Sequence, residues 1–336
     1  MITFTHAPVT REAFFNAYWA SLSERGWAHV ILHSWKHLPD AIDSDIDYAI
    51  TGVSSGELLR YLAEFCKERH WRLAQVIEHE PGAFFCACVQ RGGNFDILAL
   101  DVTWDYRRLG HILIPSDVLH DGSRSIEGKV FRVPAPGAEA AYILAKAAAK
   151  GKSFADVKQR LFDLIQEDPV GCHRALSESF GCVIPPGLPP KELATEIERW
   201  YPQASAFRPV RKGRRLGIRE IRLYLGRISR PTGLWLRFHG QEADAAIIGH
   251  ITKPLIPLFR RTYRRRRISS FRIPEVISYI IRTSLVIECE KRATGSCDRC
   301  QISVDLSRTS DAREASCQIL DKLAARVERR LSVCKS

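Results

Sequence analysis

The sequence predicts an α/β protein of the α+β type, in which a mixed sheet carries flanking helices. Apolar runs rich in β-branched residues alternate with segments whose apolar side chains recur every three or four residues, the spacings of strands and helices. Charge is also divided unevenly, since residues 1–206 carry 21 Lys/Arg and 26 Asp/Glu whereas residues 207–336 carry 29 and 12. An acidic part joined to a strongly basic part indicates two modules with different partners.

The individual elements follow from periodicity and from residues that begin or end helices. Phe14, Tyr18 and Leu22 repeat every four residues and predict the first helix, and Ser54 or Ser55 caps the second. We expect helices over residues 10–25, 54–70, 138–150, 154–165, 172–180, 191–201 and 311–331, and strands over 28–32, from Asp45 onward, and over 72–77, 83–90 and 94–103, with a Gly92-Gly93 hairpin. This order gives a sheet domain over 1–135, a helical appendage over 136–206 and a basic region over 207–336.

Bulk properties narrow the class of protein further. No apolar run reaches the roughly 18 residues of a membrane-spanning helix, and residues 1–11 lack the basic and apolar segments of a signal peptide. The chain is therefore expected in the cytoplasm. Its 10 cysteines are then reduced thiols or metal ligands rather than a disulfide framework.

Asp45 and Asp47 form the most informative pair in the sequence. Residues i and i+2 of a strand point to the same face, so the two carboxylates lie side by side at the start of a β-favouring run. A cation between them relieves their repulsion, and hard oxygen ligands suit Mg²⁺, which commonly serves bound phosphates. The alternative is that both acids face solvent on an edge strand or a turn.

A third carboxylate is expected from the strand over 94–103, which carries Asp96 and Asp101. These two are five residues apart and lie on opposite faces of a regular strand, so only one of them can join the pair. Three carboxylates could hold two divalent ions about 3.5–4 Å apart that clamp the attacking and leaving oxygens.

This arrangement resembles the polymerase-β-like nucleotidyltransferase superfamily, in which a Gly-Ser-type turn precedes an Asp-x-Asp pair and a further Asp lies on a later strand. The matching residues are Leu32-His33-Ser34 at the turn, Asp45 and Asp47 in the pair, and Asp101, with Asp96 as the alternative, on the later strand. The departure is His33 in the glycine position, where a side chain hinders the approach of phosphates to the backbone amides.

The resemblance implies a nucleotidyltransferase-type sheet and a metal-dependent transfer of a nucleoside monophosphate from an NTP to a hydroxyl acceptor. It implies two Mg²⁺ ions, held by the catalytic residues Asp45, Asp47 and Asp101. The expected substrate-binding residues are Ser34, Ser44 and Lys146, with Lys150 one turn further along the same helix. A solvated helix face is the alternative for both lysines.

The first 200 residues are more specifically similar to a bacterial subgroup from surface-polysaccharide gene clusters, in which this domain is fused to a thymidylate-kinase-like P-loop module. The similarity is carried by Leu38-Pro39, Asp105-Tyr106-Arg107-Arg108, Glu139-Ala140-Ala141-Tyr142 and Asp168-Pro169-Val170-Gly171-Cys172. It implies a kinase-like α/β region after residue 230.

That kinase-like region is expected to be degenerate, truncated and inactive. A P-loop reads G-x-x-x-x-G-K-[ST], but counting from Gly240 its last three positions are Ala245, Ala246 and Ile247. The 97 residues from Gly240 to Ser336 are also fewer than the roughly 150 that a five-stranded P-loop sheet needs. We therefore expect no active P-loop kinase.

The basic region offers two other candidates for binding. Nine Lys/Arg over 208–230 and six arginines over 260–267 could bind an anionic membrane surface or a lipid-linked acceptor. A nucleic acid is less favoured because no binding motif is present, and a solvated surface is the alternative. Cys289, Cys297 and Cys300 resemble part of a zinc site, but no fourth ligand has a standard spacing, so incidental thiols are favoured over zinc.

Two main hypotheses follow. The first is a metal-dependent nucleotidyltransferase of surface polysaccharide biosynthesis, cytoplasmic and peripheral to the inner membrane. The second is a catalytically inactive scaffold or regulatory protein at the membrane surface, which His33 and the lost P-loop favour. The nucleotide, the acceptor and the oligomeric state stay open.

Overall fold

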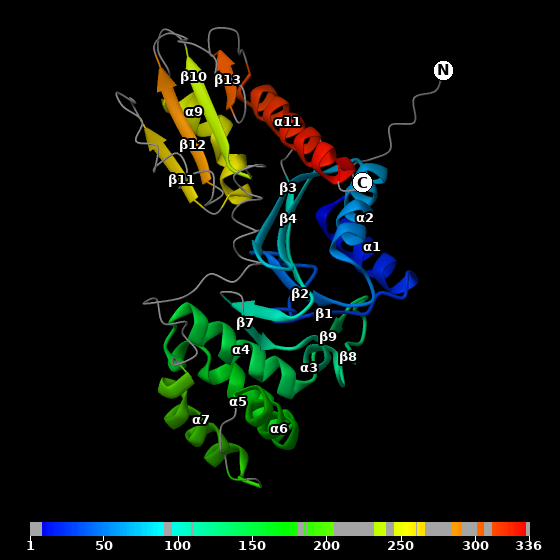
Figure 1. The fold of residues 1–336 in the computed structure, drawn as a ribbon, viewed down its shortest axis with the longest axis vertical. Coiled ribbons are helices and arrows are strands. Elements are labelled where there is room, and N and C mark those ends of the chain that lie inside the picture. Colours follow the sequence, from blue (N-terminus) through cyan, green and yellow to red (C-terminus); the bar gives the residue numbers. More distant parts are fainter. Residues whose placement is uncertain are drawn as a thin grey trace.

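The computed structural model confirms the mixed α/β class, with one five-stranded mixed sheet, a second parallel sheet and helices around both (Figure 1). It describes residues 9–90, 96–108, 111–180, 185, 187–204, 232–239, 245–259, 261–265, 284–290, 301–305 and 311–333. The predicted Gly92-Gly93 hairpin, the P-loop position at Gly240, the basic segment 208–230, and Cys297 and Cys300 of the zinc candidate lie outside these residues.

The five-stranded sheet places the two acid-bearing strands side by side. Its order is β1-β2-β5-β4-β3, with β2 and β5 parallel and each other neighbouring pair antiparallel. Its strands are β1 (His29–Ile31), β2 (Ile46–Ile50), β3 (Trp71–Glu80), β4 (Ala83–Gln90) and β5 (Ile97–Thr103). The sequence predicts each of them, with β3 ending three residues earlier than the structure shows.

Two helices cover one face of this sheet. α1 (Arg11–Glu24) begins where the Thr10 side chain accepts a hydrogen bond from the Ala13 amide, and Ser54 caps α2 (Ser55–Glu68) in the same way. Large side chains from both helices and from alternate strand positions form the first core, among them Phe14, Tyr18, Leu62, Phe65, Tyr48, Leu100 and Val102. Because side chains alternate along a strand, the intervening Asp47 and Asp101 point to the other face.

The other face is covered in two separate places. Beside β1 and β2, Val30 and Ala49 pack in a second core against the helices that follow the sheet. These helices are α4 (Pro136–Lys150), α5 (Lys158–Glu167), α6 (Pro169–Phe180) and α7 (Pro190–Ala204). Beside β3 and β4, Ala74 and Ala87 pack in a third core with C-terminal residues. The acid-bearing part of the sheet lies between these two covered regions (Figure 1).

The C-terminal part forms a parallel sheet of order β11-β12-β10-β13. Its elements are β10 (Leu234–His239), α9 (Ala245–Thr252), the 3-10 helix Lys253–Leu258, β11 (Arg261–Arg265), β12 (Ser284–Glu290), β13 (Gln301–Asp305) and α11 (Ala312–Val333). α11 joins the two parts of the chain, since Ile319 lies in the third core and Val327 in the first. A small α/β unit agrees with the expected class of this region, and its relation to a kinase stays a prediction.

Several short elements are absent from the sequence prediction. Before residue 207 they are β6 (Tyr106–Arg108), β7 (His111–Ile114), α3 (Ser116–His120), β8 (Arg124–Ser125), β9 (Arg132–Val133) and a 3-10 turn (Phe154–Asp156), which the predicted helix over 154–165 joins to α5. After it they include α9, β11, β12 and β13. Strands of two to four residues are too short to show an alternation. The boundaries at 135 and 206 stay predictions. None of the helices in the described part of the chain has the length and apolar character needed to cross a membrane.

Candidate metal centre

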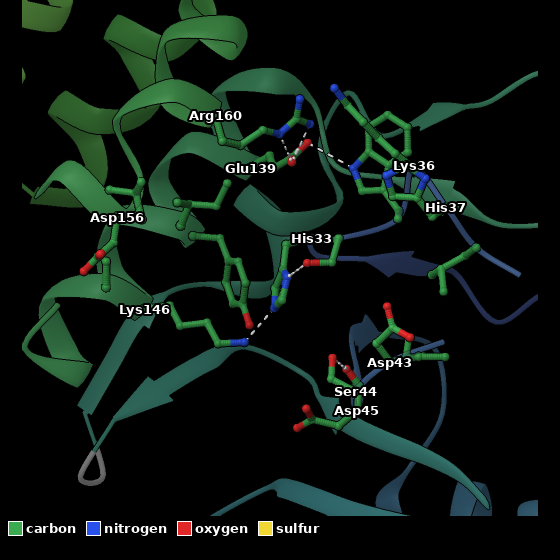
Figure 2. Close-up of a pocket in the computed structure, with 18 of the residues that line it drawn as sticks. His33, Lys36, His37, Asp43, Ser44, Asp45, Glu139, Lys146, Asp156 and Arg160 are labelled. Carbon is green, nitrogen blue, oxygen red and sulfur yellow. Dashed lines mark hydrogen bonds and ion pairs between the residues drawn. The ribbon is translucent and has the colours of Figure 1, made fainter. Parts of the chain in front are cut away.

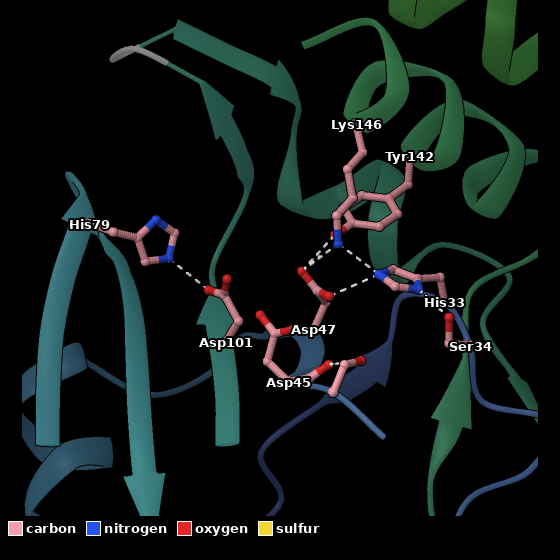
Figure 3. Close-up of polar contacts among 9 residues, drawn as sticks. His33, Ser34, Asp45, Asp47, His79, Asp101, Tyr142 and Lys146 are labelled. Carbon is pink, nitrogen blue, oxygen red and sulfur yellow. Dashed lines mark hydrogen bonds and ion pairs between the residues drawn. The ribbon is translucent and has the colours of Figure 1, made fainter. Parts of the chain in front are cut away.

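Three carboxylates converge on the open part of the sheet. Asp47 and Asp101 are partners in the parallel register of β2 and β5, and Asp45 precedes Asp47 by two residues on the same face. One oxygen from each of the three can be chosen so that all lie within 4.8 Å of one another, and Figure 3 shows the three side chains pointing toward one another. Asp96 precedes β5 and, by the alternation of the strand, falls on the same face as Leu98 and Leu100, whose side chains enter the first core. It is not part of the carboxylate group.

The surroundings of Asp45 and Asp47 shift their pKa values in opposite directions. Burial raises the pKa of Asp45, and the negative charges of Asp47 and Asp101 raise it further. Burial alone would also raise the pKa of Asp47, but a hydrogen bond to His33 and the charge of Lys146 outweigh it and hold that pKa well below its ordinary value. Asp47 is therefore an ionised carboxylate in a nearly closed environment, its side chain 12% exposed.

Helix α4 supplies two of the groups that hold Asp47. Tyr142 and Lys146 are four residues apart, so they lie on the same face of the helix. The Tyr142 hydroxyl donates to Oδ1 of Asp47 at 3.1 Å, and Lys146 Nζ lies 2.8 Å from the same oxygen (Figure 3). Burial raises the pKa of Tyr142 well above its ordinary value, so its hydroxyl keeps the proton that it donates.

His33 holds the other oxygen of Asp47. Its Nε2 lies 2.8 Å from Oδ2 of Asp47 and 2.7 Å from Lys146 Nζ, while its Nδ1 lies 2.6 Å from the Ser34 hydroxyl. Ser34 adopts a φ of 56°, the left-handed conformation that turns favour. His33, which stands where the resemblance predicts a glycine, thus links the predicted substrate-binding residue Ser34 to the predicted metal ligand Asp47.

A histidine from a strand bulge holds Asp101. In the pairing of β3 with β4, Glu78 faces Phe84 and Glu80 faces Ala83, which leaves His79 as the extra residue. Bulges next to functional sites redirect a side chain, and here Nε2 of His79 reaches Oδ1 of Asp101 at 2.7 Å (Figure 3). The sequence does not predict a role for His79, which lies just beyond the strand expected over 72–77.

A cavity of about 580 Å³ opens beside the carboxylates (Figure 2). Asp45 lines one end of it, together with the predicted substrate-binding residues Ser34, Ser44 and Lys146. Its lining also contains the cationic side chains of Lys36, Lys150, Lys152 and Arg160. The structure thus brings together every residue predicted to bind substrate, although their role stays a prediction.

The far wall of this cavity contains a buried ion-pair network. Glu139 is 1% exposed, and Arg160 donates to its Oε1 through Nε and Nη2 at 2.9 and 2.6 Å. Trp35 Nε1 donates to Oε2 at 3.2 Å, and Arg124 lies further away at 3.9 Å. Arg160 pairs with Glu139 and Lys146 pairs with Asp47, so the positive charge that a ligand in the cavity would meet comes mainly from the other lysines of its lining.

The donor set fits a divalent cation. All three groups offer carboxylate oxygens, which are hard ligands of the kind that Mg²⁺ and Mn²⁺ prefer. Asp47 is ionised, and hydrogen bonds hold one oxygen of Asp101 and both of Asp47, the kind of outer support that orients metal ligands.

Comparison with known proteins adds one finding. No protein-family model matches the chain, and no curated protein matches it. A crystal structure of an antigenic nucleotidyltransferase-like protein from Paracoccidioides brasiliensis shares 14% sequence identity and a TM-score of 0.32, over 51% of this chain and 89% of that one. The geometry of the site, rather than this likeness, carries the functional conclusion.

Proposed function

We propose that this chain is a divalent-metal-dependent nucleotidyltransferase that moves a nucleoside monophosphate from an NTP to a hydroxyl acceptor. The observation that carries the proposal is the convergence of Asp45, Asp47 and Asp101 from two parallel strands beside a lysine-lined cavity. The residue pattern that resembles the nucleotidyltransferase superfamily places its three acids at these same positions.

The charges of the cavity suit a triphosphate. Ser34 and Ser44 line the cavity together with Asp45, and Lys150 and Lys152 supply positive charge to it. Divalent ions at the three carboxylates would neutralise charge on the phosphates and on the leaving pyrophosphate. Asp101 would accept a hydrogen bond from the acceptor hydroxyl, which favours loss of its proton.

The test is a comparison of aspartate variants. Asp45→Ala and Asp47→Ala are each expected to abolish Mg²⁺-dependent NTP turnover and to leave the circular dichroism spectrum unchanged. Asp43→Ala is the matched control, because Asp43 lines the same cavity but lies outside the carboxylate group, and it should keep most of the turnover. Wild-type turnover in both Asp45→Ala and Asp47→Ala would remove this site from consideration.

A second candidate function is a non-catalytic scaffold. His33 and Lys146 already contact Asp47, and α9 begins with Ala245, Ala246 and Ile247, where a P-loop would need Gly, Lys and Ser or Thr. Calorimetric titration of each NTP with Mg²⁺ separates the two functions. Lack of any binding at millimolar nucleotide would favour the scaffold, and saturable binding that Asp47→Ala abolishes would favour the enzyme.

The partners of the basic region are part of the same proposal. An anionic membrane surface or a lipid-linked acceptor suits its arginines, and a role in polysaccharide biosynthesis would place the acceptor there. Sedimentation with vesicles that contain anionic lipid tests this, with vesicles of neutral lipid as the control. Equal recovery with both kinds of vesicle would count against a membrane partner.

A further inference from the structure

The Lys146 ammonium group lies beside Asp47, one of the three carboxylates that could together bind a metal cation. Its Nζ is 2.8 Å from Oδ1 of Asp47, and its side chain is 18% exposed beside a carboxylate that is 12% exposed. A pair so placed is shielded from water, so its attraction exceeds that of an ordinary surface pair. Without a metal, Lys146 is therefore the cation that Asp47 holds.

The contacts of His33 allow a second arrangement of this group. Nε2 of His33 carries either a proton or a lone pair in the neutral ring, so it can donate to Asp47 or accept from Lys146, but not both. When the Lys146 side chain moves away, Nε2 of His33 donates to Asp47 without competition from Lys146. Asp47 then keeps its orientation through its hydrogen bonds to His33 and Tyr142. Oδ1 of Asp47 then has room for another cation.

The Lys146 side chain can also adopt a second position, inside the cavity. It lines the cavity that also contains Ser34, Lys150 and Lys152, so rotation about its flexible side chain can turn the ammonium group from Asp47 toward a phosphate bound there. Burial lowers the pKa of Lys150 and the positive charge of Lys146 lowers it further, so the two ammonium groups repel each other.

We propose that Lys146 acts as an internal substitute for the divalent metal, which weakens metal binding until a triphosphate draws its side chain away. This inference rests on the proposed function, because it assumes that the three carboxylates bind a metal. It makes metal and nucleotide binding mutually dependent, since each ligand favours the same displaced position of Lys146. The free protein then binds the metal weakly, and the nucleotide and the metal bind together.

Direct Mn²⁺ binding to the full chain without nucleotide tests the proposal, for example by electron paramagnetic resonance of the free ion. Lys146→Gln should bind Mn²⁺ about tenfold more tightly than wild type, because no cation competes for Asp47. Lys150→Gln is the matched control. It removes the same charge one helical turn further along α4, where the ammonium group acts on Asp45 and Asp47 through Coulombic interaction, so its Mn²⁺ affinity should stay within about twofold of wild type.

The outcomes separate this inference from the proposed function. Equal or weaker Mn²⁺ binding by Lys146→Gln, or the same gain in both variants, would overturn the inference and leave the metal site intact. Absence of Mn²⁺ binding in all three proteins would overturn the inference, and its absence from wild type with an NTP present as well would overturn the proposed function too. Tighter binding by Lys146→Gln together with full NTP turnover in Asp47→Ala would support the inference and reject the proposed reaction. If Lys146→Gln does not fold by circular dichroism, Lys146→Met, which keeps the apolar stem, replaces it.

Discussion

His79 is the single residue on which the orientation of Asp101 depends most directly, because its Nε2 lies 2.7 Å from Oδ1. Loss of such an outer partner typically weakens metal binding about 10- to 100-fold. We therefore predict that His79→Phe binds Mn²⁺ at least about tenfold more weakly than wild type, measured by calorimetric titration. His250→Phe, at an exposed histidine of α9, is the control, and equal affinities in all three proteins would show that His79 does not support the site.

Glu139 provides a prediction about stability at the same scale. Glu139 is buried and Arg160 is partly buried, so Glu139→Ala leaves the guanidinium without its partner and should lower the free energy of unfolding by about 1–3 kcal/mol. Glu198→Ala removes a carboxylate that pairs with Lys158 at the surface and should cost no more than about 1 kcal/mol. Urea unfolding followed by circular dichroism measures both, and equal losses would contradict a buried network.

Single residues also show which features of the site the sequence predicts and which it does not. The alternation of a strand predicts Asp45 and Asp47 on one face, and it predicts that only Asp96 or Asp101 can join them. It could not predict His79, because a bulge shifts the alternation of β3, nor the contact of Tyr142 with Asp47, which joins positions 95 residues apart. Such contacts depend on the order of the strands and on where α4 packs, and neither has a local signal.

At the scale of elements, the packing of α4 against α6 controls where Lys146 and Tyr142 lie. A side chain on Gly137 would overlap the carbonyl oxygen of Gly171, which is backbone and cannot move aside easily. Gly137→Ala should therefore destabilise the protein by about 1–3 kcal/mol through overpacking. It should also weaken nucleotide binding, because α4 must shift and Lys146 moves with it.

The matched control for this element is Gly249→Ala in α9, where a new methyl group meets nothing within 4 Å. Helix propensity alone should make this variant as stable as wild type or up to about 1 kcal/mol more stable. Thermal unfolding and calorimetric titration of an NTP compare the two variants. A Gly137→Ala protein as stable as Gly249→Ala would show that α4 and α6 do not approach so closely.

Elements were predicted well where their period is long and their caps are local. The four-residue repeat of Phe14, Tyr18 and Leu22 and the predicted serine cap at Ser54 locate α1 and α2 to within two residues of each end. The break between the turn Phe154–Asp156 and α5 was missed, because apolar residues continue the helical period across it. The short strands β6 to β9 were missed because hydrogen bonds to distant partners, rather than periodicity, define them.

At the scale of the whole molecule, α11 connects the cores of the two sheets. Arg72 of β3 pairs with Asp321 of α11 at 2.9 Å, and the buried Gln75 amide donates to the Thr232 carbonyl. These two contacts therefore help to hold the C-terminal sheet and the five-stranded sheet together. The sequence predicts the closing helix but not this role, since an amphipathic pattern does not say which surface the helix covers.

This connection predicts that the two sheets unfold together. Ile319 is 1% exposed in the third core, so Ile319→Ala should lower the free energy of unfolding by about 2–5 kcal/mol. If unfolding is cooperative, hydrogen exchange should become at least about tenfold faster in α1 and α2 as well as in β10. Ile247→Ala, at a position 38% exposed in α9, is the control and should leave exchange in α1 unchanged. Faster exchange confined to residues 232–333 in Ile319→Ala would mean that the C-terminal sheet opens by itself, without the sheet that bears the carboxylates.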